Sequence, residues 1–396
     1  MVIRDWSSDV CSSDLVFFGV VFSTLMTSMQ EGSYEYYIRS ITEFYSGHLQ
    51  VQDTAWWEDR SVNHTFVPSL TLMREIPEKK GVRGLSLRIE SFALASAGNT
   101  TRGVAVMGVL PSMEDSLTHL SRKIVSGRYL TEADSGVYLA SGLADFLKLQ
   151  SGDTLALISQ GYHGSSAAGL FPIRGIFKHP TPALNNQLLV MSLPACQQFF
   201  SLHGRVSSLV VMLHNNRGID ELRTQAAALA GDSLRVMDWA EMQPELVQQV
   251  ESDRASNGLM KLLLYIIIGF GILGTIIMMM KERSREMGVM VASGMQKYRL
   301  GMLLIVETIF LSALGVVAGL AGSLPLVFYF YHHPIPFTGQ AAEAMLAYGW
   351  EPVLMFSVHY QVFLQQALTI FVLALLVAVY PLLHIRKMNV AERLKS

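Results

Sequence analysis

The stretch that decides the fold is LLLYIIIGFGILGTIIMMM, which occupies Leu262–Met280. It contains no charged residue, and Lys261 and Lys281 stand at its two ends. At about 1.5 Å of rise per residue, a helix over this stretch is roughly 28 Å long, close to the thickness of the hydrocarbon core of a bilayer. The stretch therefore predicts a membrane-spanning helix, which we place at residues 258–280.

Three further apolar segments predict membrane spans. Residues 300–330 are longer than one crossing requires, so this helix is expected to tilt or to extend beyond the bilayer. Residues 362–385 have an ordinary length for a span, whereas the apolar run in residues 15–30 is short for one. Together the four segments predict an α-helical membrane protein with four transmembrane helices, the first of them truncated.

The first fourteen residues, MVIRDWSSDVCSSD, do not fit the start of a membrane helix. They lack the positive region and the small-residue cleavage site of a signal peptide. They resemble translated sequencing-adapter read-through. Residues 1–14 are therefore expected to be non-native, and Cys11 is given no functional weight.

Composition excludes several classes of protein. The chain has 396 residues, of which 51% are hydrophobic and 16% charged. This is too apolar for a disordered protein, and the charged residues exclude a chain that lies entirely within the membrane. The net charge of −2 gives no reason to expect a nucleic-acid partner. Two cysteines make neither a disulfide framework nor a four-ligand zinc site, so no metal is expected.

The basic residues predict the orientation in the membrane. They gather in residues 281–299 and in the tail, residues 386–396, whereas residues 331–361 contain no lysine or arginine. The positive-inside rule places the two basic segments in the cytoplasm and the third segment outside. Residues 31–257 then form a large extracytoplasmic domain.

This domain shows strand-like runs separated by Gly, Pro and Asn, together with helical patterns, and so predicts an α+β domain of two subdomains. The expected strands are Leu155–Ile158, Phe171–Phe177, Leu188–Met191 and Ser207–Leu213, and the expected helices are Leu139–Leu149 and Ile219–Ala230. Val236–Asn257 predicts a stalk that leads into the membrane. Ser165 and Ser166 fall in a hairpin loop rather than a nucleophile elbow, and Trp56 and Trp57 are expected to pack locally.

The segment between the second and third spans, KERSREMGVMVASGMQKYR, occupies residues 281–299. Its charged start, its apolar Met287, Val289, Met290 and Val291 and its break at Gly294 predict a short amphipathic helix at the inner membrane face. Such a helix either binds anionic lipid or presents one side to the groove of a cytoplasmic partner. Composition alone leaves both readings open.

The order of residues in this segment resembles the pattern E-R-T-R-E-I-G-x-x-x-A-L-G-A of FtsX/MacB/LolC–LolE-type ABC transporter permeases. The matching residues are Glu282, Arg283, Arg285, Glu286, Gly288, Ala292 and Gly294, while Ser293 departs from the usual leucine. The tail at Asn389–Leu394 is similar to the family's tail, with Val390 in place of a proline. The resemblance implies a coupling helix that docks into an ATP-binding subunit. It also implies a MacB-like periplasmic core domain and a place in the bacterial inner membrane.

The third span has two further features, an acidic residue and a run of small residues. Glu307 lies about 10 Å deep at most, so pairing with a loop arginine or snorkelling is as reasonable as a direct role in transport. Gly315, Ala318, Gly319 and Gly322 form a small-residue pattern that predicts close helix packing. This pattern favours a subunit interface over a contact within the chain.

The chain contains no G-x-x-x-x-G-K-[ST] loop, so ATP is expected on a separate subunit and no cofactor on this one. The predicted protein is a non-enzymatic permease half that pairs with a second copy or a homologue, two ATPase subunits and membrane lipids. The expected role is lipoprotein release of the LolC/LolE kind, with a periplasmic lipoprotein or carrier as a further partner. The resemblance implies that the carrier-binding hook of LolC-type subunits falls between the strands Leu155–Ile158 and Phe171–Phe177, where this chain has only the short connection QGYHGSSAAGL. The alternatives are MacB-like efflux of peptides or hydrophobic compounds, and FtsX-like signalling to a cell-wall hydrolase.

Overall fold

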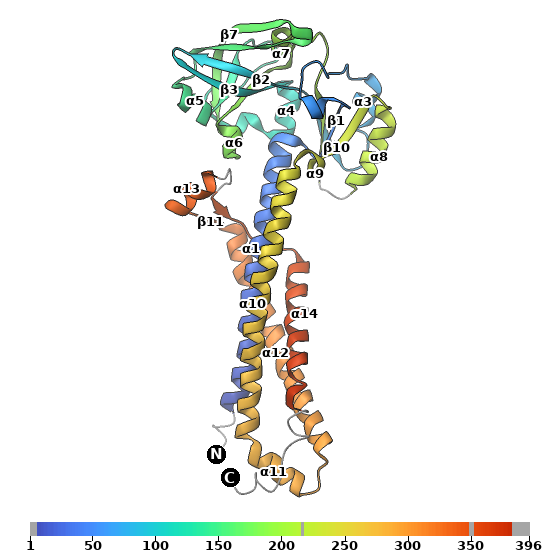
Figure 1. Cartoon of the computed structure of the whole chain (residues 1–396), viewed down its shortest axis with the longest axis vertical. Coiled ribbons are helices and arrows are strands. Elements are labelled where there is room, and N and C mark those ends of the chain that lie inside the picture. Colours follow the sequence, from blue (N-terminus) through green and yellow to red (C-terminus); the bar gives the residue numbers. More distant parts are fainter. Residues whose placement is uncertain (1–5, 215–217, 348–351, 382–396) are drawn as a thin grey trace. The chain divides into compact units, whose positions relative to one another are not determined.

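The computed structural model describes residues 6–214, 218–347 and 352–381 (Figure 1). The chain forms two compact units. The helical unit comprises Met1–Tyr36, Gln248–Phe337 and Val353–Ser396, as far as these ranges are described. The sheet unit comprises Tyr37–Val247 and Thr338–Pro352, again within the described ranges.

Four long helices carry the four predicted spans. They are α1 (Trp6–Ile41), α10 (Pro244–Glu282), α12 (Lys297–His332) and α14 (Tyr360–Val377), and the described part of the chain contains four helices long and apolar enough to cross a membrane. A short helix, α11 (Ser284–Ala292), lies between α10 and α12, and β11 (Ile335–Pro336) pairs with β12 (Val353–Leu354). The predicted fold class is confirmed. The tail, including Asn389–Leu394, and the end of the fourth predicted span lie outside the described residues.

The helices extend beyond the predicted apolar segments. The predicted stalk, for example, is not a separate element, because α10 starts at Pro244 and continues without interruption into the apolar run. Proline suits the first position of a helix, where no backbone N–H bond is lost. The residues before it form the end of a strand and a short helix, α9 (Trp239–Met242).

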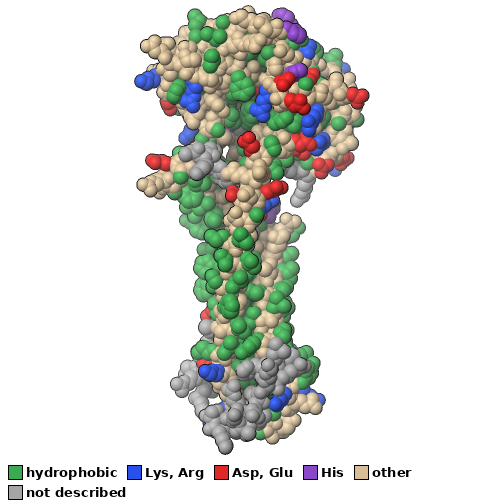
Figure 2. Space-filling view, in the orientation of Figure 1, with side chains coloured by type: hydrophobic (Ala, Val, Ile, Leu, Met, Phe, Trp, Pro, Cys, Tyr) green, Lys and Arg blue, Asp and Glu red, His purple; other side chains and the backbone are tan. Residues whose placement is uncertain are grey.

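Hydrophobic side chains cover much of the visible surface of the helical unit (Figure 2). Large apolar residues such as Phe270, Phe310 and Val317 are each more than 65% exposed. In water such a surface is unfavourable, but in a bilayer lipid tails cover it at no cost. The exposed surface therefore fits helices that span a membrane.

The interior of the helical unit is a core shared by all of its long helices and by α11. Its buried members are Val16, Val20, Ile268, Ile272, Ile276, Met280, Met287, Leu300, Leu304, Ile370 and Ala374. Glycine brings α1 close to its neighbours, since a Cβ atom built on Gly19 would lie 3.2 Å from Ile268 of α10 and 3.3 Å from Ile370 of α14. At Gly32 the approach is closer still, because such a Cβ would lie 2.4 Å from the backbone of Phe356.

The small residues of α12 pack against α1 of the same chain. A Cβ built on Gly315 would lie 2.9 Å from the Cβ of Val16, and one on Gly319 would lie 2.8 Å from that of Val20. A Cβ built on Gly322 would lie 3.0 Å from the ring of Phe17. The subunit interface expected at these three glycines is therefore wrong: the contact is intramolecular. Only Ala318, the fourth member of the pattern, is exposed.

The sheet unit is built on one ten-stranded sheet. Its strands are β1 (Leu49–Asp53), β2 (Val82–Ala97), β3 (Thr100–Val109), β4 (Ile124–Gly127), β5 (Val137–Ala140), β6 (Thr154–Gln160), β7 (Ser166–Phe177), β8 (Leu188–Ser192), β9 (Ser208–Leu213) and β10 (Leu234–Asp238). β2, β3, β8, β5, β7 and β6 pair in a closed circuit, since β6 returns to β2. The other part of the sheet has the order β10–β1–β9–β2. The two predicted subdomains are thus two regions of one sheet that share β2.

Shorter helices pack on the sheet. They are η1 (Thr42–Ser46, a π-helix), α2 (Trp56–Asp59), α3 (Leu70–Glu75), α4 (Pro111–Thr118), η2 (Leu120–Lys123), α5 (Ser141–Leu147), η3 (Tyr162–Gly164), α6 (Pro182–Asn185), α7 (Leu193–Phe200) and α8 (Ile219–Ala230), with α13 (Gln340–Ala347) also assigned to this unit. The predicted helix Leu139–Leu149 is wrong at its start, because residues 139–140 end β5 and the helix begins at Ser141. A short apolar run alone does not distinguish a buried strand from a buried helix. By contrast, α8 matches its predicted bounds.

A substitution tests the close packing of α1 on α12. Gly319→Ala places a methyl group where it would meet the Cβ of Val20 at 2.8 Å, so the helices must separate, and we expect a loss of about 1–3 kcal/mol in stability. The matched control is Gly274→Ala in α10, because a Cβ there has no described neighbour within 4 Å. Thermal unfolding of the purified chain in detergent should show a lower Tm for the first variant only. Equal Tm values would contradict the packing argument.

Candidate functional site

The short helix α11 has a well-defined start and end. Arg283 interrupts the helix after α10, with a φ of −91° and a ψ of 12°. At the other end, Gly294 adopts a left-handed conformation with a φ of +102°. The N–H of Gly294 bonds to the carbonyl of Val291, and that of Met295 bonds to the carbonyl of Met290. This pair of bonds is a Schellman motif, which requires glycine at the left-handed position. Gly294 therefore ends α11 and turns the chain toward α12.

One face of α11 is buried in the helical unit. Met287 is 3% exposed and belongs to the same core as Met280 of α10 and Leu300 of α12. Gly288, beside it, is also buried, and Met290 packs against the edge of that core. The helix is thus attached to the ends of two long helices by apolar contacts.

The opposite face of α11 is exposed. It carries Arg285, Glu286, Val289 and Ala292, which recur at the three- and four-residue spacing that places side chains on one side of a helix. Val289 is 54% exposed and is an apolar residue among charged ones. Glu282, at the end of α10, is exposed as well. We call Arg285, Glu286, Val289 and Ala292 the outer face of α11.

An ion pair ties the start of α11 to α12. Nη1 of Arg283 donates a hydrogen bond of 2.6 Å to Oε1 of Glu307, and the two side chains are 24% and 28% exposed. Charge-assisted bonds of this length are among the stronger ones in proteins. Glu307 therefore has a loop arginine as its partner, as one of the sequence-based interpretations had it, and that arginine is Arg283. Because the two residues are 24 positions apart, no local sequence pattern predicts that they pair.

The seven residues that match the family pattern thus divide into two groups. Glu282, Arg285, Glu286 and Ala292 are exposed, whereas Arg283, Gly288 and Gly294 position the helix through an ion pair, burial and a turn. Of the apolar residues in this segment, Met287 is buried and Val289 is exposed, a difference that the sequence pattern does not show.

The other candidate residues lie elsewhere. Ser165 lies in the connection between β6 and β7, and Ser166 is the first residue of β7, where it pairs with Gln160 of β6. Trp56 is 2% exposed and lies close to Trp57, with ring centroids 6.2 Å apart. No group of three His, Cys, Asp or Glu that could hold a metal occurs within residues 6–214, 218–347 and 352–381.

A comparison with protein families covers the segment that contains α11. The family described as "FtsX-like permease C-terminal" matches residues 258–390, a range that contains α11, its ion pair and the glycines of α12. This part of the chain is therefore similar to the C-terminal region of FtsX-like permeases.

Individual relatives of this chain are distant. The chain is 20% identical over 266 residues to the lipoprotein-releasing system transmembrane protein LolC of Neisseria meningitidis serogroup B, a match that covers 65% of this chain and 64% of LolC. The solved extracellular domain of the noncanonic ABC-type transporter YknZ from Gram-positive bacteria aligns with 48% of this chain and 100% of that domain, at 13% identity and a TM-score of 0.36. The solved periplasmic region of MacB from Actinobacillus actinomycetemcomitans aligns with 53% of this chain and 95% of that region, at 15% identity and a TM-score of 0.36.

Charge reversal tests whether Arg283 and Glu307 act as a pair in this chain. Arg283→Glu places two carboxylates together, and Glu307→Arg places two cations together, so each should lower the Tm. The double variant restores opposite charges and should recover most of the loss. We expect a coupling of about 1.5–3 kcal/mol, the range for hydrogen bonds to charged groups.

Thermal unfolding of the single and double variants in detergent measures this coupling, with Arg285→Glu on the exposed outer face as the control that leaves the Tm unchanged. Losses that simply add in the double variant would show that the two residues act independently.

Proposed function

We propose that this chain is the permease subunit of an ABC transporter and that the outer face of α11 docks into a groove of a separate ATPase subunit. The observation that supports this most directly is the division of α11 into two faces. Met287 fixes one face to the core of the helical unit, and Val289 stands exposed on the other, next to Arg285 and Glu286. An exposed apolar residue with charged neighbours is typical of a docking surface.

The same geometry suggests how a push on α11 reaches the long helices. Met287 joins α11 to α10 and α12 through the core, and Arg283 holds its first turn to Glu307 of α12. Closely packed side chains transmit displacement because they have little free volume to absorb it. In this proposal, ATP-driven closure of the partner moves α11 and α12 together, and the long helices convey the movement to the sheet unit.

The proposed orientation follows from the basic residues. The strongly basic segments at residues 281–299 and 386–396 lie in the cytoplasm, where an ATPase has access to α11. The sheet unit then lies in the periplasm of a bacterial inner membrane. Because Ala318 is exposed while the glycines beside it face α1, it contacts lipid or a second permease, either another copy or a homologue.

For the transported substrate we propose lipoprotein release or export. The support is the similarity to LolC, a transmembrane protein of a lipoprotein-releasing system, over 65% of this chain. The connection between β6 and β7, where the resemblance places the carrier-binding hook of LolC-type subunits, is here a tight turn between Gln160 and Ser166. A carrier protein would therefore bind to another subunit, which favours a LolE-like position for this chain.

Docking is tested with two exposed valines. Val289→Ala removes the apolar centre of the outer face of α11, whereas the control Val317→Ala makes the same change on α12, where the side chain is 67% exposed. We expect Val289→Ala to weaken co-purification with the ATPase subunit and to lower stimulated ATP hydrolysis several-fold, and Arg285→Glu to abolish association. Normal co-purification and hydrolysis in both α11 variants would refute docking at this face.

The substrate is tested by stimulation of ATP hydrolysis. The permease and its ATPase are reconstituted in liposomes with a triacylated lipoprotein, with the same protein lacking its lipid, or with an apolar peptide. Stimulation by the lipidated form alone is the expected result. Stimulation by the apolar peptide would favour MacB-like efflux, and no stimulation by any of them would favour FtsX-like signalling.

A further inference from the structure

The first long helix ends in the sheet unit as a π-helical turn. α1 passes without a break into η1, and residues from Tyr37 onward belong to the sheet unit. The N–H of Gly47 bonds to the carbonyl of Thr42 at 2.9 Å, the five-residue separation that defines a π-helix. Such turns are rare and often occur at functional sites. The end of α1 is therefore a place to look for a function.

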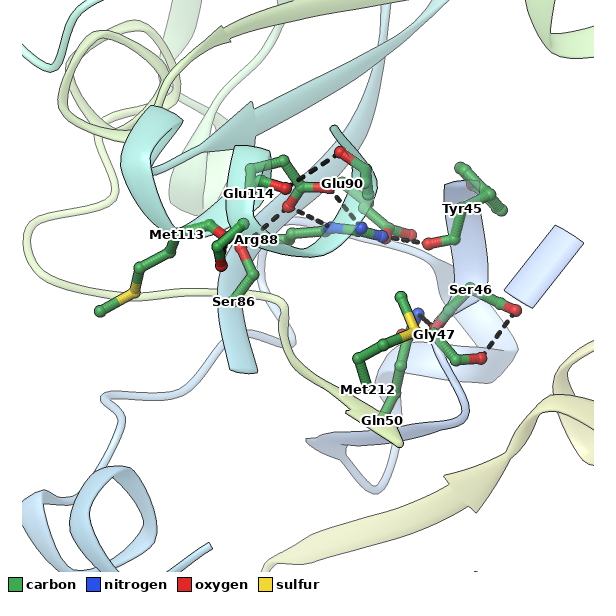
Figure 3. Close-up of polar contacts among 12 residues, drawn as sticks. Tyr45, Ser46, Gly47, Gln50, Ser86, Arg88, Glu90, Met113, Glu114 and Met212 are labelled. Carbon is green, nitrogen blue, oxygen red and sulfur yellow. Dashed lines mark hydrogen bonds and ion pairs between the residues drawn. The ribbon is translucent and has the colours of Figure 1, made fainter. Parts of the chain in front are cut away.

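The last carbonyl groups of this helix have buried partners from the sheet. Carbonyls at a helix end have no partner within the helix. Nη1 of Arg88 in β2 donates a hydrogen bond to the carbonyl of Tyr45, and Nε2 of Gln50 in β1 donates one of 2.7 Å to the carbonyl of Ser46 (Figure 3). Because the carbonyl end of a helix carries partial negative charge, a guanidinium is favourable there. Arg88 and Gln50 thus hold the end of the helix to the sheet.

The guanidinium of Arg88 is itself held in place. Arg88 and Glu114 of α4 are fully buried and form a bidentate pair, with Nη2 to Oε1 at 2.6 Å and Nε to Oε2 at 3.0 Å. Ser86 donates a further bond of 2.8 Å to Glu114, and the carboxylate of Glu90 lies 3.9 Å from Nη1 of Arg88. Charge-assisted bidentate bonds fix both distance and direction. A displacement of Tyr45 therefore acts on β2 and α4 together.

Arg88 occupies a special position in the sheet. It is the residue of β2 at which pairing with β9 ends and pairing with β3 begins, since it lies opposite both Ser208 of β9 and Val109 of β3. Its carbonyl also accepts hydrogen bonds from the N–H and the hydroxyl of Ser207, at 3.0 and 3.2 Å. A force applied at Arg88 thus reaches the two regions of the sheet that share β2.

The covalent route from α1 reaches a different part of the sheet. After Gly47 the chain enters β1, which is separated from β2 by β9 in the order β10–β1–β9–β2. The N–H of Trp239, which follows β10, bonds to the carbonyl of His48 at 3.1 Å and joins β10 to the same place. Chain continuity alone would therefore move β1 and β10 first. Arg88 adds a direct link from the helix end to β2.

We propose that Arg88 is a positioning residue that anchors the end of α1 to β2 and transmits displacement of α1 to both regions of the sheet. Glu114 orients the guanidinium, and Gln50 provides a second bond to the helix end. The part of Arg88 in transport rests on the proposed movement of the long helices, whereas the anchor is a property of the chain alone.

The anchor is tested with Arg88→Lys. Lysine keeps a cation beside the buried Glu114, so no uncompensated charge remains, but one ammonium cannot replace the bidentate pair and the bond to Tyr45 together. The matched control is Arg205→Lys, because Arg205 also donates to a backbone carbonyl of the sheet unit, that of Thr65, which lies outside η1. Gln50→Met removes the other bond to the helix end and leaves Arg88 and Glu114 intact.

Hydrogen–deuterium exchange of the full-length variants in peptidiscs measures the anchor. We expect the amides of residues 42–50 to exchange about tenfold faster in Arg88→Lys, because a hydrogen bond to a charged group is lost. Gln50→Met should change the same amides to a smaller extent, and Arg205→Lys should leave them at the unmodified rate. Equal exchange of residues 42–50 in all of these proteins would overturn the anchor.

Transmission is tested by ATP hydrolysis in liposomes that contain the ATPase subunit and a triacylated lipoprotein. Arg88→Lys should co-purify with the ATPase and keep the basal rate, because α11 is unchanged, but its stimulation by the lipoprotein should fall several-fold. Arg205→Lys should keep full stimulation. A defect of folding would instead lower the Tm and the basal rate of Arg88→Lys as well.

The two tests fail in different ways. Faster exchange in Arg88→Lys together with full stimulation would refute its role in transmission. If the unmodified chain neither binds the ATPase nor responds to the lipoprotein, the proposed function fails, and the exchange of residues 42–50 still decides whether Arg88 anchors α1.

Discussion

The close approach of α1 to its neighbours is the constraint on which the helical unit depends. Gly19, Gly32, Gly315 and Gly319 lie where a Cβ atom would be 3.2 Å or less from another element of the chain. In a bilayer, helices gain little from the hydrophobic effect when they associate, because lipid tails are as apolar as the side chains. Close van der Waals packing therefore supplies the attraction, and glycine permits it. The core around Val16 and Val20 forms as a result.

This packing gives the short helix α11 a firm base. Met287 enters the core that α1, α10, α12 and α14 share, and Arg283 adds a charge-assisted bond to α12. The exposed outer face of α11 therefore does not move independently of the long helices. A family pattern that looks uniform in sequence thus contains two kinds of residue: those that hold α11 in place and those that are exposed for a partner.

Much of the fold was predictable, because membrane spans leave a strong signal. The charge-free run at Leu262–Met280 and the distribution of lysine and arginine depend on length and composition alone. Local signals also located α8, which follows a left-handed Gly218, and the β6–β7 hairpin. Local signals did not predict the strand at residues 139–140. These residues belong to β5, which is buried and paired between β7 and β8. Local signals also do not show which helix packs against the small residues of α12.

The sequence by itself determined the number of spans, the class of the large domain and the segment that carries the family pattern. Only the tertiary structure decided which residues meet: Gly315 and Gly319 with α1, Arg283 with Glu307, and Arg88 with Glu114 beside Glu90. The physical reason is that hydropathy and helical spacing are properties of neighbouring residues. Close packing and buried charge pairs join residues far apart in the chain, and a single sequence carries no record of those distances.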